Sequence, residues 1–266
     1  MHPLGEAYLR KAMLPSIYCP GCGTGTVMNS MLHVIDDLGG IDEFLFVSGI
    51  GCSGWLGPTI HGDELHTLHG RALAVATGVA ISRPDKHLVV FTGDGDCLGI
   101  GGNHFIHAAR RNLNVTVVLI NNMNYGMTGG QTAPLTPHDS VTRTSPYGNS
   151  EFPFDAVSLA VGSGATFAAR ETAAHPRRII ATVKKAIAHR GFALVDVVCQ
   201  CPTHAGRNFF GSSDPVVMLN ALRERAITDK NVSLDPGQFR VGVLHQDNSR
   251  PPFKTRKPSA DGSVTS

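Results

Sequence analysis

The chain has 266 residues, of which 42% are hydrophobic and 17% charged, enough for one large α/β domain with a sizeable core or at most two domains. Its net charge of +2 gives no reason to expect a nucleic acid or a membrane surface as partner. No apolar run approaches the roughly 20 residues that span a bilayer, and the first six residues lack the form of a signal peptide. We therefore expect a cytoplasmic protein, whose six cysteines are metal ligands or free thiols rather than disulfides.

The first third of the chain predicts two helices around a buried strand. After an irregular lead-in over residues 1–17, with room for a short helix, a helix is expected from Thr24 until Gly39 and Gly40 end it. Residues 44–47 predict a buried strand that runs into the Gly- and Ser-rich segment 48–55. A second helix is expected to stop near Arg83, and its apolar positions are Leu68, Ala72, Val75 and Val79.

The centre of the chain reads as a strand, a crossover helix and a parallel strand. The apolar runs 88–91 and 115–120 predict the strands, and residues 100–111 can form the helix. Polar and glycine residues follow both runs, at 93–96 and at 121–126. Ligands of open α/β sheets bind at the carboxyl ends of strands, so we expect a doubly wound, mainly parallel α/β sheet with its site at these two turns.

The second half predicts further α/β elements after a long loop. The loop at 128–153 is long for a compact domain, which favours a lid or a partner surface. Helices are expected at 154–161, 175–189 and 214–226, and strands at 165–168 and 193–198. Residues 1–245 are expected to form one domain, followed by a polar tail at 246–266 that we predict to be disordered.

The turn Gly93-Asp94-Gly95-Asp96 and the pair Asn121-Asn122 have a spacing typical of a diphosphate site, because Asn122 follows Asp94 by 28 positions. Glycine lets backbone amides approach a phosphate closely, and Asp and Asn oxygens are ligands that Mg²⁺ prefers. The alternative is a Gly-rich turn in which an Asp caps the following helix. The pattern resembles the diphosphate-binding motif of thiamine diphosphate enzymes.

The cysteines suggest a metal centre. Cys19, Cys22, Cys52 and one of Cys199 and Cys201 lie at turns or strand ends that can converge on one edge of the sheet. Four thiolates could bind zinc or a [4Fe–4S] cluster, and the spacing alone fits either. Buried free thiols are the alternative, and Cys97 is expected to pack as a small apolar group.

Six short motifs occur in order and together resemble a known family. They are Cys-Pro-Gly-Cys-Gly, Ser-Gly-Ile-Gly-Cys-Ser, Leu-His-Gly-Arg-Ala, Gly-Asp-Gly-Asp, Asn-His-Phe-Ile-His-Ala-Ala-Arg-Arg-Asn and Tyr-Gly-Met-Thr-Gly-Gly-Gln. They resemble the beta subunit of the 2-oxoacid:ferredoxin oxidoreductases, most closely the 2-oxoglutarate branch, over residues 18–207.

The resemblance implies thiamine diphosphate, Mg²⁺ and a [4Fe–4S] cluster as cofactors. It implies Cys19, Cys22, Cys52 and Cys201 as cluster ligands, with Cys199 an extra thiol. Mg²⁺ would be held by Asp94, Asn122 and the backbone carbonyl of Asn124. His69 is implied as a catalytic residue, or alternatively as a helix cap near Gly70. The implied cofactor contacts are Ile50, Gly51, Cys52, Ser53, His69, Gly93, Asp94, Gly95, Asp96, Asn122, Gly126, Met127 and Thr128.

The implied reaction is oxidative decarboxylation of a 2-oxo acid, foremost 2-oxoglutarate, with coenzyme A to an acyl-CoA and CO₂, or the reverse carboxylation. Electrons would pass through the cluster to ferredoxin. An alpha subunit, with any further small subunits, would be the partner and would carry the carboxylate that activates the cofactor.

One departure from the family pattern concerns the substrate. Trp55 stands where family members that act on 2-oxoglutarate often have a basic residue, and His61 or His66 could substitute for it. Pyruvate or a branched-chain 2-oxo acid is therefore an alternative substrate. Two other classes stay open, namely a non-redox thiamine diphosphate lyase with a structural zinc and an electron carrier with a decayed cofactor site.

Overall fold

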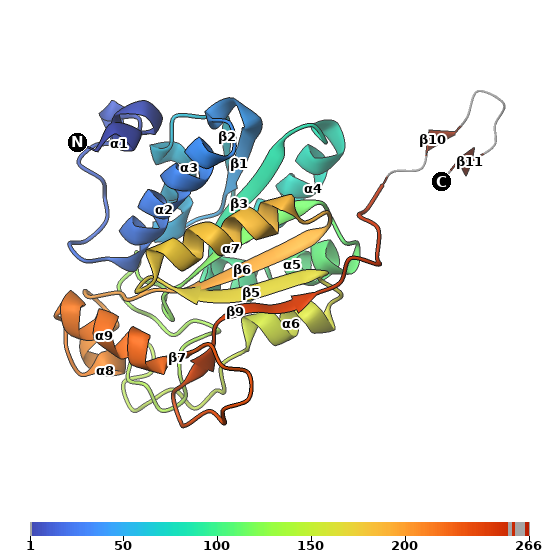
Figure 1. Cartoon of the computed structure of the whole chain (residues 1–266). Helices are drawn as coiled ribbons and strands as arrows, with labels where there is room; N and C mark the ends of the chain where they lie inside the picture. Colours follow the sequence, from blue (N-terminus) through green and yellow to red (C-terminus); the bar gives the residue numbers. More distant parts are fainter. Residues whose placement is uncertain (1, 255–256, 259–263, 266) are drawn as a thin grey trace.

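The computed structural model describes residues 2–254, 257–258 and 264–265, and most of this chain folds around one seven-stranded sheet (Figure 1). The strand order is β2-β1-β3-β4-β6-β5-β9. All neighbours pair in parallel except β5 and β9, which are antiparallel. The strands are β1 Phe44–Ser48, β2 Glu64–His66, β3 His87–Gly93, β4 Val115–Asn121, β5 Phe167–Thr172, β6 Phe192–Val198 and β9 Gly242–Gln246.

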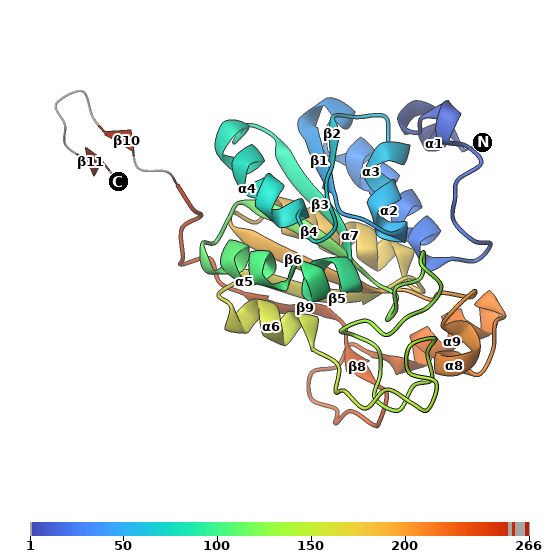
Figure 2. The ribbon, with the colours of Figure 1, turned by 180° about the vertical axis from the view of Figure 1, so that it is seen from behind.

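Helices cover both faces of the sheet, which confirms the predicted doubly wound architecture. Helices α2 (Gly23–Asp37) and α7 (Pro176–Ala188) pack on the face seen in Figure 1, where Val27, Met31 and Ile179 join one apolar core. Helices α4 (Ala72–Ser82), α5 (Gly102–Arg110) and α6 (Ala156–Gly162) cover the other face (Figure 2), where Leu73 and Phe105 join a second core. The central strands are apolar on both sides because each face meets helices.

Local sequence features explain where these helices begin. Asp155 caps α6 because its side chain accepts a hydrogen bond from the backbone N–H of Ser158, 2.7 Å away. Pro176 opens α7 at a position where its missing N–H costs nothing. Strand and helix thus alternate along the chain as the periodicity predicts.

The register of the central strands brings three turns together. Ser48 of β1 pairs with Phe91 of β3, and Gly93 of β3 pairs with Ile120 of β4. The segments that follow β1, β3 and β4 therefore leave the sheet side by side at one edge. Between β3 and α5 the chain forms η4, a π-helical segment over Gly95–Ile100, a form that often occurs at functional sites.

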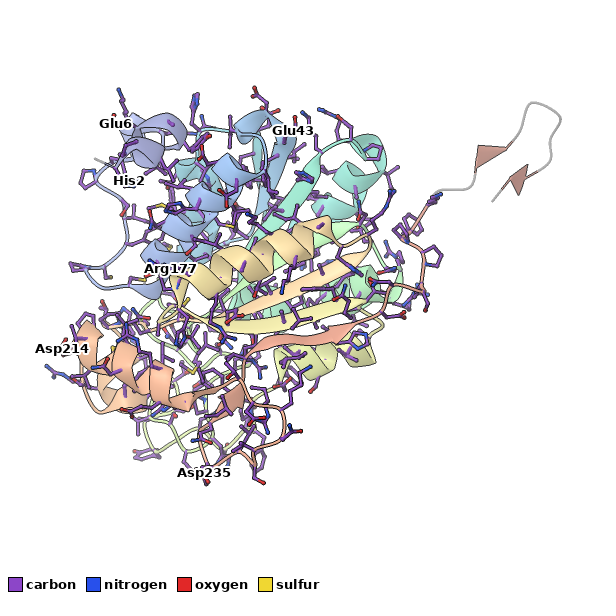
Figure 3. All side chains as sticks on the ribbon, in the orientation of Figure 1. His2, Glu6, Glu43, Arg177, Asp214 and Asp235 are labelled. Carbon is purple, nitrogen blue, oxygen red and sulfur yellow. The ribbon has the colours of Figure 1, made fainter. Side chains whose placement is uncertain are left out.

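The remaining elements lie outside the seven-stranded sheet and the five helices that cover it. Charged side chains labelled in Figure 3, among them Glu6, Arg177 and Asp235, are exposed around the edge of the fold. No described helix combines the length and apolar character that crossing a membrane requires. These remaining elements are α1 Pro3–Tyr8, η1 Lys11–Met13, η2 Ile41–Glu43, η3 Cys52–Trp55, α3 Leu56–Thr59, α8 Gly206–Phe210, α9 Pro215–Arg225, β7 Ala226–Ile227, β8 Phe239–Arg240, β10 Lys257–Pro258 and β11 Val264–Thr265.

Several element predictions need correction. Leu68 does not belong to the helix it was expected to open, because α4 begins at Ala72 and Leu68 lies 77% exposed in the preceding turn. Strand β5 begins at Phe167 rather than at 165, and β9 was missed. The loop at 128–153 is confirmed as a segment without helix or strand.

The predicted boundary between domain and tail falls inside a strand. Strand β9 continues to Gln246, and Asn112 donates hydrogen bonds from Nδ2 to the carbonyls of Arg250 and Pro251. The Phe253 side chain packs on the core that faces α5. The prediction of disorder over 246–266 lies in part outside the described residues, so it stays a prediction.

Candidate active site

A pocket opens at the edge where the three turns meet. Every residue that the sequence predicted as a cofactor contact lines it, as does Asn124. Ile120 and Tyr125 also line it and were not predicted. The pocket therefore joins the segments that follow β1, β3 and β4 with the turn before α4. That it binds a cofactor is a prediction from the sequence.

Three oxygens converge on one side of the pocket. The side-chain amide of Asn122 places its Oδ1 3.0 Å from Asp94 Oδ1 and 2.8 Å from the carbonyl oxygen of Asn124. Rotating the amide would instead let Nδ2 donate to both oxygens. Without a cation the rotated orientation satisfies both oxygens, whereas the first orientation presents three oxygens that a hard cation such as Mg²⁺ could bind.

Asp94 is the group on which such a cation would act most strongly. Its side chain is 1% exposed, and its Oδ2 has no hydrogen-bond partner among the described residues. Burial raises the pKa of Asp94 to about 8, since few groups compensate a charge there. Met123, between the two asparagines, has a φ of 60°, a strained conformation that holds the turn. A bound cation would supply the missing partner, so these residues fit Mg²⁺.

The raised pKa of Asp94 gives a pH-dependent stability in the metal-free chain. The folded state binds a proton more tightly than the unfolded state, whose Asp has a pKa near 3.8, so the folded state holds more protons between about pH 4 and pH 8. Stability should therefore fall as the pH rises through that window, and Mg²⁺ should restore it at pH 8.

Chemical denaturation of the metal-free chain at several pH values checks this expectation. An Asp94→Asn variant should lose this part of the slope, because it has no carboxyl group to titrate. An equal slope in the variant and the parent would contradict the assignment of the slope to Asp94.

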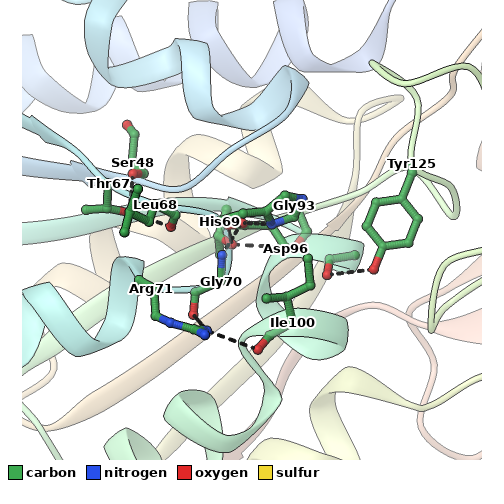
Figure 4. A network of polar contacts seen from close by, with 12 residues as sticks. Ser48, Thr67, Leu68, His69, Gly70, Arg71, Gly93, Asp96, Ile100 and Tyr125 are labelled. Carbon is green, nitrogen blue, oxygen red and sulfur yellow. Dashed lines mark hydrogen bonds and ion pairs between the residues drawn. The ribbon is translucent and has the colours of Figure 1, made fainter.

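His69 lines the pocket, and Asp96 lies next to its ring (Figure 4). His69 Nδ1 lies 2.7 Å from Asp96 Oδ1, although the ring N–H is not aligned with that oxygen. The same Oδ1 accepts a 2.7 Å hydrogen bond from the backbone N–H of Gly70, and Oδ2 accepts a 2.6 Å bond from Thr92. His69 thus does not cap a helix, and its imidazole is held at the pocket wall.

Tyr125 closes the pocket beside the glycine turn. Its hydroxyl donates to the carbonyl of Gly95, 3.1 Å away, and its ring lies edge-on to His69 (Figure 4). A Cβ at Gly95 would lie 2.2 Å from the Tyr125 ring, so this position requires glycine. The close approach explains why the first residue after Asp94 has no side chain.

The cysteines gather beside this pocket. Cys52 lines the pocket, and Cys201 Sγ lies 3.7 Å from the place where a Cβ on Gly126 would stand. Burial raises the pKa of Cys52, and charge on Cys22, Cys201 and Cys19 raises it further, to about 12. The four predicted ligands are thus neighbours, and Cys19 is exposed while Cys201 is buried.

Two hydrogen bonds join the segments that carry these cysteines. The backbone N–H of Gly23 donates to the carbonyl of Gln200 at 3.1 Å, and Gln200 Nε2 donates to the carbonyl of Gly21 at 3.0 Å. Across the described ranges, no three His, Cys, Asp or Glu side chains are placed so that they could share a single metal ion. A [4Fe–4S] cluster has a different requirement, because each thiolate binds its own iron.

The two remaining cysteines lie in the apolar interior. Cys97 is 3% exposed and packs in the core on the α5 side, as predicted. Cys199 is fully buried in the opposite core, and burial raises its pKa well above the usual range. A Cβ at Gly23 would come within 2.8 Å of Cys199 Cβ, so the side chain packs against the start of α2.

A buried ion pair connects the carboxyl-terminal halves of β4, β5 and β6 next to the pocket. Arg170 of β5 donates from Nε to Asp196 Oδ2 at 2.7 Å, and from an Nη atom to Asp155 at 2.7 Å. Asp196 is fully buried and accepts a further bond, 3.1 Å long, from Asn121 Nδ2. The pair therefore reaches Asn121, the residue next to Asn122 of the pocket wall.

Replacing Arg170 by methionine should lower the free energy of unfolding by about 3–5 kcal/mol, because it leaves the Asp196 charge buried and unpaired. Urea denaturation checks this value. The double change Arg170→Met with Asp196→Leu should recover much of the loss, since no buried charge then remains. A double variant as unstable as the single one would argue that shape, rather than charge, makes Arg170 important.

The residues expected to recognise the substrate lie outside the pocket wall. The Trp55 ring packs near His66, with centroids 6.0 Å apart, and His66 Nδ1 lies 3.8 Å from Glu64 Oε1. His61 donates its backbone N–H to the carbonyl of Tyr8. Among the described residues, the pocket lining includes none of Trp55, His61 and His66, and no Lys or Arg.

The fold and the pocket together define the class of thiamine pyrophosphate enzymes. A family model described as "Thiamine pyrophosphate enzyme, C-terminal TPP binding domain" matches residues 49–197, which include most of the pocket wall. The match begins just after β1 and ends in β6, so it contains the three turns at the sheet edge.

Comparison with individual proteins identifies the family. The 2-oxoglutarate synthase subunit KorB of Methanocaldococcus jannaschii is 50% identical over 85% of this chain and 84% of its own length. The subunit of that name from Archaeoglobus fulgidus is 49% identical over 90% and 88%, respectively. The chain belongs to the 2-oxoacid:ferredoxin oxidoreductase family, as a beta subunit.

A solved structure agrees with this placement. The 2-oxoglutarate:ferredoxin oxidoreductase from Magnetococcus marinus, with 2-oxoglutarate, coenzyme A and succinyl-CoA bound, matches with a TM-score of 0.82 and 34% sequence identity. The match covers 93% of this chain and 86% of that chain. The predicted family and fold class are thereby confirmed.

Proposed function

We propose that this beta subunit binds thiamine diphosphate, Mg²⁺ and a [4Fe–4S] cluster and oxidises 2-oxoglutarate with coenzyme A to succinyl-CoA and CO₂. Ferredoxin would accept the electrons, or donate them for the reverse carboxylation. The observation that carries the proposal is the contact between the two sites, because Cys52 belongs to the pocket wall and to the cysteine group. The named substrates of the relatives support the choice of 2-oxoglutarate.

Each part of the pocket has a definite task in this reaction. Thiamine diphosphate, when bound, supplies an electron sink for the loss of CO₂. Asp94, Asn122 and the Asn124 carbonyl would hold the metal ion that binds the diphosphate. His69 lines the pocket with Asp96 beside its ring, so the imidazole could accept or donate a proton there.

The described pocket lining offers no Lys or Arg as a partner for the distal carboxylate of 2-oxoglutarate. The carboxylates of the lining cannot form an ion pair with an anion either. We therefore propose that the alpha subunit supplies this cation, together with the carboxylate that activates the cofactor. The second candidate is a more apolar 2-oxo acid, because Trp55 and Met127 offer no charge.

The test is anaerobic purification with the alpha subunit, followed by ferredoxin reduction with coenzyme A across several 2-oxo acids. Preference for 2-oxoglutarate is the expected result. Preference for pyruvate or a branched-chain acid would replace the substrate while keeping the chemistry. A complex that holds both cofactors and reduces ferredoxin with none of these acids would refute the proposed function.

A further inference from the structure

The cysteine group reaches the molecular surface at one of its members. Cys19 is exposed, whereas Cys22 and Cys52 are half-buried and Cys201 is buried. Ile17, two residues before Cys19, is an apolar side chain that is also exposed. The cysteine group is therefore closest to solvent at the turn that carries Cys19.

Helix α9 begins beside this turn, as both views of the ribbon show (Figures 1 and 2). A Cβ at Gly21 would lie 2.2 Å from Cγ of Pro215, the first residue of α9. Val216 is 63% exposed, and Val217 is exposed as well. The turn and the start of the helix thus present apolar side chains on one surface.

The exposed face of α9 leads from these valines to a cation. Val216, Asn220 and Arg223 follow one another at helical spacing, so they lie on the same face of the helix, and all three are exposed. Arg223 donates from an Nη atom to Asn220 Oδ1 at 2.9 Å. Met218 and Leu222 are buried on the opposite face, which fixes the row to point toward solvent.

The start of α7 brings a second cation to this surface. Ala174, Val198 and Leu222 form one apolar cluster, so the turn before α7, the end of β6 and α9 meet. Arg177 lies in the first turn of α7 and is exposed (Figure 3). Neither Arg177 nor Arg223 makes an ion pair with a carboxylate of the described residues.

The carboxylates of this region do not cancel its positive charge. Asp214 caps α9 by accepting a 2.8 Å hydrogen bond from the backbone N–H of Val216, so its charge is offset by the helix N-terminus. Glu224 stands between Arg223 and Arg225 in the sequence. The surface therefore combines an apolar centre with arginines at its rim.

We propose that an acidic one-electron carrier protein docks on this surface, an inference that rests on the proposed function. Apolar contacts inside a charged rim are the usual anatomy of a protein interface, and complementary charge speeds the encounter. Short-lived electron-transfer complexes need only a small interface, which one turn and one helix face provide. The residues of this surface, called the α9 surface, are Ile17, Cys19, Arg177, Val216, Val217 and Arg223.

The exposure of Cys19 favours a carrier over the alpha subunit as the occupant. An electron accepted by the cysteine group has to leave the complex, and an acceptor on the α9 surface would stand directly over the exposed cysteine. A permanently covered α9 surface would instead separate the carrier from the cluster.

The test measures ferredoxin binding by anaerobic calorimetry to complexes purified with the alpha subunit, using a bacterial-type ferredoxin. Val216→Ser and Arg177→Glu should each weaken binding about tenfold at low ionic strength, because the first removes an apolar contact and the second reverses a rim charge. High salt should reduce the effect of Arg177→Glu and leave that of Val216→Ser.

Two matched controls lie at the opposite edge of the sheet. Ile81→Ser replaces an exposed apolar residue at the end of α4, and Arg190→Glu reverses an exposed charge just before β6. Both should leave ferredoxin binding unchanged. Reduction of the cluster by 2-oxoglutarate and coenzyme A, followed by EPR without ferredoxin, should be unchanged in all four variants, because none of them alters the pocket wall.

Ferredoxin binding that is unchanged in both Val216→Ser and Arg177→Glu overturns the inference. Loss of the alpha subunit from either complex also overturns it, since the α9 surface would then be a subunit interface. Slower cluster reduction in either variant would overturn it as well, because the change would act inside the enzyme. Failure of the proposed function would show differently, as a wild-type complex whose cluster no 2-oxo acid reduces.

Discussion

An Asp94→Ala enzyme is expected to lose its thiamine diphosphate and to turn over more than about 100-fold more slowly. This loss is larger than the loss usually caused by replacing a residue that hydrogen-bonds to a metal ligand. Asp94 contributes the only carboxylate among the three converging oxygens, so its removal takes away most of the charge that attracts Mg²⁺. Titration calorimetry with thiamine diphosphate and Mg²⁺ measures the binding, and ferredoxin reduction by the complex with the alpha subunit measures the turnover.

Two further variants show whether charge or space is responsible. Asp94→Asn keeps an oxygen at nearly the same place, so it should bind cofactor better than Asp94→Ala but worse than the parent. Asp85→Ala removes an exposed carboxylate paired with Arg83 and should leave both measurements unchanged. If the Asp94→Ala variant bound its full complement of cofactor, Asp94 would not be needed for cofactor binding.

The central strand-helix-strand unit could be predicted because its pattern is local. Residues 88–91 and 115–120 are continuous apolar runs, and the polar residues follow each run at once. Parallel pairing then brings the two strand ends to one edge without any further information. The contacts of Asp94 and Asn122 follow from that rule, and the approach of Cys52 and His69 to the same pocket followed from the resemblance.

Features that depend on distant pairing could not be predicted in this way. Arg170 and Asp196 pair across the neighbouring strands β5 and β6, but in the sequence each is only a charged residue within an apolar run. Strand β9 is short and half-buried, so its pattern resembles that of a loop. Leu68 suggested a helix by spacing alone, but Gly70, with a φ of 70°, separates it from α4. Tyr125 reaches the pocket because Gly95 leaves room for its ring, a fit that no periodicity encodes.

The position of Cys52 has a functional consequence. It lies in the turn after β1, directly before Ser53, and both line the pocket in which the cofactor would react. Cys201 approaches the pocket from the opposite segment, beside Gly126. Electrons that leave a substrate in this pocket would therefore meet the cysteine group without crossing the sheet, which explains why the two sites occupy one edge.

Cys201→Ala is expected to abolish cluster assembly and ferredoxin reduction, whereas Cys199→Ala should retain both. The two residues are neighbours with buried side chains, so they form a matched pair. Charge on Cys201 contributes to the raised pKa values of both Cys22 and Cys52, after burial, and its Sγ lies beside Gly126 of the pocket wall. Cys199 instead packs in the apolar core against Gly23, where loss of its sulfur leaves only a small cavity.

Iron and acid-labile sulfide, measured on anaerobically purified complexes with the alpha subunit, distinguish the two variants. A full iron content in Cys201→Ala together with its loss in Cys199→Ala would exchange their roles. Loss in both would mean that the segment 199–201 must keep its packing for a cluster to form. Since Cys199 makes its contact with α2 through Cβ, which alanine retains, we expect that packing to survive and, of these two cysteines, only Cys201 to be needed for the cluster.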